Sequence, residues 1–122
     1  MARTVKVQNS DEVMAMLGEP GTFYKGRWQK IVVTKIGEDD STPLEVRKSL
    51  VGLTIPTIFS KEHLDSQGVD LKIPSGSRLS YVPDIIQVLR SVGKDEEANQ
   101  LERISPNPLD MYIFEDKTYQ VL

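Results

Sequence analysis

The 122-residue chain contains no cysteine, and this absence excludes several chemistries at once. Disulfide bonds, thiolate zinc sites, iron–sulfur clusters and cysteine nucleophiles all require the thiol group. Histidine is almost as scarce, because His63 is the only one. A zinc site would need carboxylates for its other ligands, and a Ser-His-Asp relay could form only around this residue. We therefore predict no catalytic residues, no metal site and no cofactor.

Long apolar runs and a strong charge of one sign are also missing. No stretch reaches the roughly 18 apolar residues that span a membrane, and the N-terminal segment lacks the apolar core of a signal peptide. The net charge of −3 does not favour nonspecific binding to nucleic acid. Apolar residues make up 39 % of the chain, which is too many for a disordered protein. We predict a cytoplasmic, soluble protein with no membrane contact.

Apolar periodicity predicts several short elements in the N-terminal half. Residues 3–8 and 22–36 have the patterns of strands, and the run Ile31-Val32-Val33 is typical of a central strand covered on both faces. Residues 9–17 predict a helix, because a capping box precedes an apolar face.

A second helix is predicted to begin at Thr42-Pro43-Leu44-Glu45. Thr42 would be the N-cap, Pro43 would occupy the first helical position, and Glu45 would complete a capping box. Gly52 would end this helix. Four apolar side chains of the helix are expected to face the core: Leu44, Val46, Leu50 and Val51.

The C-terminal half predicts further strands and a pair of helices. Residues 53–59, LTIPTIF, indicate an edge strand or a crossing segment, because Pro56 lacks the N–H that a central strand donates. Residues 69–73 alternate like a strand. Residues 83–92 and 95–104 predict two helices that meet at a tight corner.

The last twelve residues, 111–122, predict a β-hairpin. A loop at Asp116-Lys117 would pair Phe114 with Tyr119, and Tyr112 with Val121. We therefore predict one small α+β domain over residues 1–122. It would contain a mixed or mostly antiparallel sheet, three to four short helices and a C-terminal β-hairpin. A small barrel-like sheet with inserted helices is the alternative.

The loop Pro74-Ser75-Gly76-Ser77-Arg78 is the best candidate for contact with an anion. It offers small polar residues, free N–H groups and an arginine shortly before a helix. Arg78 and Ser77 would contact the anion. The candidate supporting residues are Arg47 and Arg90, and the candidate stacking residues are Tyr24 and Trp28.

Paired acids suggest a competing function. Asp39 and Asp40 precede the predicted helix at Pro43, where negative charge stabilises the positive helix end. The same pair could bind a metal together with Asp70 and Lys72, as in a metal-dependent phosphodiesterase or nuclease. The helix-end interpretation requires no metal and is preferred.

These observations predict a nonenzymatic binding protein. We expect a homo-oligomer that holds a protein partner or a small anionic ligand such as a nucleotide. The terminal hairpin would provide the contact between subunits. The alternatives are a metal-dependent phosphodiesterase and a structural adaptor subunit.

Overall fold

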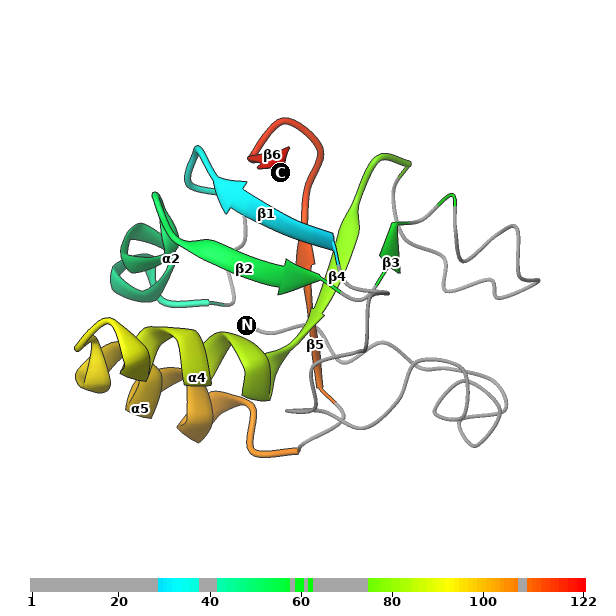
Figure 1. Cartoon of the computed structure of the whole chain (residues 1–122). Coiled ribbons are helices and arrows are strands. Elements are labelled where there is room, and N and C mark those ends of the chain that lie inside the picture. The colour runs from blue at the N-terminus through cyan, green and yellow to red at the C-terminus, as the bar shows by residue number, and fades with distance from the viewer. Residues whose placement is uncertain (1–28, 38–41, 58, 61, 63–74, 108–109) are drawn as a thin grey trace.

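The structure is a computed structural model that describes residues 29–37, 42–57, 59–60, 62, 75–107 and 110–122 (Figure 1). Helices and antiparallel strands are both present in these residues, so the α+β prediction is confirmed. The elements run in the order β1 (Gln29–Val33), α2 (Leu44–Leu50), β2 (Thr54–Thr57), β3 (Phe59–Ser60), β4 (Arg78–Tyr81), α4 (Val82–Ser91), α5 (Asp95–Ile104), β5 (Met111–Phe114) and β6 (Tyr119–Val121). The elements predicted over residues 3–8, 9–17 and 69–73 lie outside the described residues.

The strands form two antiparallel sheets of three, where the sequence predicted one sheet. Their orders are β2-β1-β6 and β3-β4-β5. The chain passes from the first sheet to the second between β2 and β3, which are separated by one residue. Pro56 lies in β2, opposite Lys30 of β1, at the edge of the first sheet among the described strands. The missing proline N–H is tolerated at an edge, as the sequence indicated.

Ile31, Val32 and Val33 lie in β1, which pairs with β2 on one side and with β6 on the other. The predicted central strand is therefore confirmed. Ile31 and Val33 are buried and Val32 is half-buried.

The C-terminal hairpin is confirmed only in its turn. The Thr118 N–H donates to the Glu115 carbonyl at 3.2 Å, and Lys117 has a φ of 70°. The two arms then pair with different strands, β5 with β4 and β6 with β1. The predicted aromatic pairs across the hairpin are therefore wrong.

Hydrogen bonds that follow the turn explain this divergence. The Thr118 carbonyl accepts the Thr34 N–H at 2.8 Å, which directs β6 toward β1. The Tyr112 and Phe114 rings instead contact each other along β5, with centroids 4.9 Å apart. In the described part of the chain, the backbone thus crosses between the two sheets at two places, from β2 to β3 and from β5 to β6.

One apolar core joins the first sheet to the helices and to β5. Figure 1 shows α4 and α5 packed against each other beneath β2. The buried members of the core come from both sheets and all three described helices: Ile31, Val33, Val46, Leu50, Ile55, Val82, Ile85, Leu89, Ala98, Leu101, Tyr112 and Phe114. Burial of a large apolar side chain stabilises by roughly 1.5–3 kcal/mol.

The start of α2 differs from the prediction by one residue. Pro43 is the N-cap, and no side-chain capping hydrogen bond forms there. Val46 and Leu50 are buried as expected, whereas Leu44 is 44 % exposed and Val51 is 37 % exposed. Val46, Ser49 and Leu50 form the buried face, since residues three and four apart are neighbours on a helix, whereas Val51 is the C-cap. Gly52 ends the helical segment with a φ of 87°, as predicted.

Candidate functional site

The segment Ser75–Arg78, here called the anion turn, was the predicted anion contact. It leads directly into β4, and Gly76 has a φ of 82°, a conformation that favours glycine. The Gly76 N–H donates to Oε1 of Glu62 at 3.1 Å. The Ser75 hydroxyl donates to the same oxygen at 3.4 Å. The turn therefore holds a carboxylate oxygen that belongs to the chain itself.

Side chains from the C-terminal segment pack against the anion turn. The Tyr119 hydroxyl donates a short hydrogen bond to the Gly76 carbonyl. The Arg78 guanidinium carbon lies 6.0 Å from the centroid of the Tyr119 ring, within the range of a cation–π contact. The Asp116 side chain lies against Gly76, because a Cβ on that glycine would come 2.9 Å from the Asp116 Cγ. The turn is thus fixed by a strand of the other sheet.

The charges around the anion turn favour a bound carboxylate. The pKa of Glu62 is lowered from its usual 4.5 by hydrogen bonds from its own N–H and from the Gly76 N–H, with smaller contributions from Ser75 and Arg78. The pKa of Tyr119 is raised, mainly because burial disfavours the phenolate, while Arg78 opposes this shift. The Gly76 N–H, the Ser75 hydroxyl and Arg78 thus add to the effect of the N–H of Glu62 itself in stabilising the ionised carboxylate.

Ser77 belongs to the anion turn but is 0 % exposed. Its hydroxyl has no hydrogen-bond partner in the described part of the chain. The neighbouring Ser80 is equally buried, but its hydroxyl donates to the Pro56 carbonyl at 2.7 Å.

Arg47 lies at a different place, where it fixes the segment before α2. Its Nε donates to the Thr42 carbonyl at 2.9 Å and its Nη1 to the Gly37 carbonyl at 2.8 Å. Arg47 also lines a small hollow together with Lys35 and Glu115. That hollow has a volume of about 20 Å³, room for a single water molecule. It is too small for a nucleotide.

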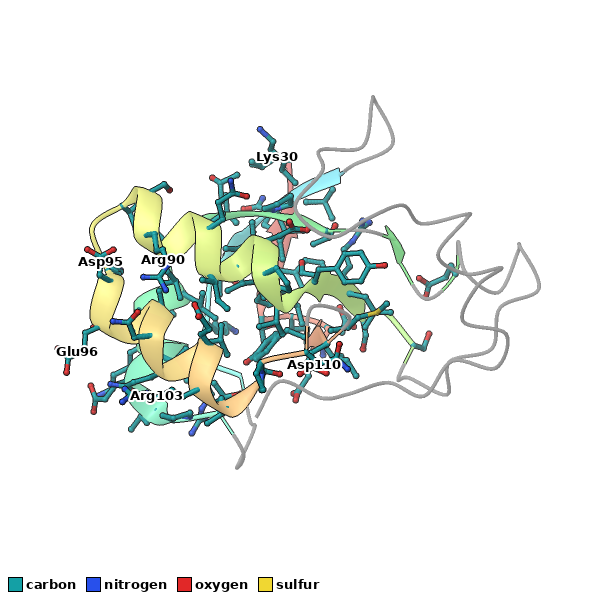
Figure 2. The ribbon with its side chains drawn as sticks, turned by 90° about the horizontal axis from the view of Figure 1, so that it is seen from below. Lys30, Arg90, Asp95, Glu96, Arg103 and Asp110 are labelled. Carbon is teal, nitrogen blue, oxygen red and sulfur yellow. The ribbon has the colours of Figure 1, made fainter. Side chains whose placement is uncertain are left out.

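Arg90 is labelled on α4 in Figure 2. Its Nη2 lies 2.8 Å from Oε2 of Glu102 on α5. Arg47, Arg78 and Arg90 therefore contact three different sets of partners. Tyr24 and Trp28 lie outside the described residues.

The residues of the competing metal site also lie outside the described part: Asp39, Asp40, Asp70 and Lys72, together with His63. Among the described side chains, no group of three or more histidines or acids could hold a metal ion. The described helices are all too short or too polar to cross a membrane.

Two residues of this site escaped the sequence analysis. Glu62 is 14 residues from Gly76 in the chain, and Tyr119 is 43 residues away. Neither spacing belongs to a local motif, so no sequence signal pointed to them. Searches for similar proteins found no matching family model, curated protein or solved structure. The geometry of the anion turn is therefore the basis for the functional argument.

Proposed function

We propose that this protein is a nonenzymatic binding protein that holds a small anionic ligand at the anion turn. The observation that carries the proposal is the convergence of the Gly76 N–H and the Ser75 hydroxyl on one carboxylate oxygen. Donors that hold the oxygen of Glu62 have the chemistry to hold the oxygen of an external carboxylate or phosphate.

Arg78 provides the positive charge beside these donors. It lowers the pKa of Glu62 through space, so its guanidinium acts on an anion at the turn. Ser75 is exposed and accessible to ligand, whereas Ser77 is buried. We therefore assign the direct contacts to Ser75, Gly76 and Arg78. Ser77 is buried, and Arg47 and Arg90 contact partners away from the turn. The stacking roles of Tyr24 and Trp28 stay predictions.

A nuclear magnetic resonance titration of the full chain tests this proposal. Adding adenosine monophosphate or inorganic phosphate should shift the amide signals of Ser75, Gly76 and Arg78 before others. An exposed site of two donors and one cation should bind in roughly the millimolar range, a binding free energy of about −4 kcal/mol. If signals across the whole surface shift equally, or none shifts, the proposal fails.

Two arginine variants provide a charge-matched comparison. Arg78→Gln and Arg90→Gln each remove one positive charge, but only the first changes the anion turn. Arg78→Gln should weaken phosphate binding by about tenfold, the effect of a lost charge-assisted contact, and Arg90→Gln by less than twofold. Ser75→Ala changes only an exposed side chain, so it provides a second test should Arg78→Gln fail to fold. It should also weaken phosphate binding. Equal effects of both arginine variants would refute the assignment.

We also propose that the protein acts as a homo-oligomer through β6. This strand lies at the edge of the first sheet in the described residues. Its last residue, Val121, is 42 % exposed, and Leu122, which follows the strand, is 69 % exposed. An exposed strand edge can pair with another chain. Light scattering should show more than one chain, and Val121→Lys should reduce the mass to that of a monomer. A wild-type monomer at every concentration would remove this part of the proposal.

A further inference from the structure

We propose that the Glu62 carboxylate is an internal ligand of the anion turn, and that an external oxyanion binds by taking its place. The inference rests on the proposed function and adds how the site is regulated. The Glu62 oxygen already accepts hydrogen bonds from the two donors that an incoming anion would need. One N–H or hydroxyl proton serves one strong acceptor at a time, so the two anions exclude each other.

The exposed position of Glu62 makes this exchange feasible. Its side chain lies at the surface, so rotation about its own bonds returns the carboxylate to water. The backbone of the turn, in contrast, is held in place, because the Tyr119 hydroxyl donates to the carbonyl of Gly76. The ligand position therefore persists when the internal carboxylate leaves it.

Among the residues that the structure describes, three charged or titratable groups besides Glu62 face the turn, and they set the kind of ligand. Arg78 attracts an anion at the turn. The Asp116 side chain lies against Gly76, and its like charge opposes an incoming anion. The phenol of Tyr119 stays neutral near pH 7, because its pKa is raised above 10.0. Replacement of Glu62 by another singly charged oxyanion leaves the local charge unchanged. A carboxylate or a singly charged phosphate group is thus the favoured class.

The expected size of the effect follows from the strength of the internal contact. Exposed ionic contacts are weak, so a contact of this kind leaves the donors free for roughly a sixth to a third of the time. Apparent affinity falls by the fraction of sites that are free. Removing the internal carboxylate should therefore tighten oxyanion binding by about three- to sixfold.

The test compares two variants that each remove one negative charge beside Gly76. Glu62→Gln removes the ionic acceptor of the turn's donors, whereas Asp116→Asn removes the carboxylate that packs against the glycine. Glu62→Ala removes the competing side chain entirely. Acetate and inorganic phosphate are titrated separately into each full-length variant, and the Gly76 amide signal is followed.

Glu62→Ala should bind about three- to sixfold more tightly than wild type, and Asp116→Asn less than twofold more tightly. The Gly76 amide signal should also move in Glu62→Ala before any ligand is added. Equal gains from Glu62→Gln and Asp116→Asn would mean that general repulsion is relieved, and would overturn the inference. If the wild type binds the oxyanion and Glu62→Ala binds it no more tightly, the inference about Glu62 is overturned while the proposed function stands. No binding by any variant would remove the proposed function itself. The acetate and phosphate arms distinguish a carboxylate ligand from a phosphate ligand.

Discussion

Replacing two buried serines by alanine should change stability in opposite directions. Ser77 and Ser80 are both 0 % exposed and three residues apart. The Ser80 hydroxyl donates to the Pro56 carbonyl at 2.7 Å, a contact between β4 and β2 that joins the two sheets. The Ser77 hydroxyl has no partner among the residues that the structure describes. The pair therefore compares a satisfied buried hydroxyl with an unsatisfied one.

The sizes follow from the cost of burying polar groups. A buried hydroxyl without a hydrogen bond costs roughly 1–3 kcal/mol. Ser77→Ala removes this cost and creates only a small void, so it should stabilise by about 1 kcal/mol. Ser80→Ala removes a hydrogen bond and leaves a buried carbonyl without that donor, so it should destabilise by about 1–3 kcal/mol.

Thermal unfolding followed by circular dichroism measures both variants. For a chain of this length 1 kcal/mol corresponds to about 4 °C in Tm. Ser77→Ala should thus raise Tm by about 4 °C, and Ser80→Ala should lower it by about 4–12 °C. Urea unfolding should give the same signs with an unchanged m-value. If Ser77→Ala lowered Tm as much as Ser80→Ala, the Ser77 hydroxyl would have a partner in solution and the reasoning would be refuted.

Three further predictions concern backbone strain, a helix end and pH. Gly76→Ala should lower the free energy of unfolding in urea more than Gly93→Ala. Both glycines have a φ of 82°, a backbone strain worth about 1 kcal/mol for alanine, but only at Gly76 would a Cβ meet another side chain. Equal losses would contradict the contact with Asp116. Lys94→Met should lower the free energy of unfolding by about 1 kcal/mol and speed amide hydrogen exchange in the last turn of α2, because the lysine Nζ donates to the Ser49 carbonyl at 2.7 Å. Unchanged amide exchange would contradict that role. The raised pKa of Tyr119 adds stability that is fully present below pH 10.0 and is lost as the pH rises through the folded-state pKa; alkaline unfolding of Tyr119→Phe should lack this component, and identical pH curves would show that the phenol does not contribute.

Local signals in the sequence located most of the described elements. The helix over residues 95–104 has the predicted bounds, and the helix at Pro83 begins one residue earlier than predicted. Gly52 and Gly93 end helical segments with positive φ, as their positions indicated. These features depend on neighbours within one or two turns, so the local sequence contains the information that determines them.

Long-range pairing was the part that the sequence could not provide. The turn at Asp116-Lys117 was predicted, but periodicity cannot tell which strand each arm will join. β5 and β6 have apolar faces that could pair with each other or with separate sheets. The choice depends on contacts with β1 and β4, whose residues are distant in the sequence.

The candidate site shows the same division between local and distant information. Small polar residues and an arginine marked the anion turn in the sequence, and the structure adds an anion already held there. Two residues that contact it, Glu62 and Tyr119, lie before and after the turn in the sequence, and no sequence motif contains both of them. Arg47 and Arg90 were predicted to support Arg78, but they contact other partners, because charge composition has no information on which cations meet.

The position of the anion turn between the two sheets has a consequence for how ligand binding and stability are related. The turn leads into β4 of one sheet, and the Tyr119 hydroxyl that holds it belongs to β6 of the other. The sheets therefore position the donors before any ligand arrives, and the exposed Glu62 side chain is the part that must move. Affinity should then depend on Glu62 with little change in unfolding free energy, because exposed hydrogen bonds contribute little to folding. Tyr119→Phe should behave differently. It should lower both the unfolding free energy and the ligand affinity, because it removes the hydrogen bond that holds the backbone of the turn.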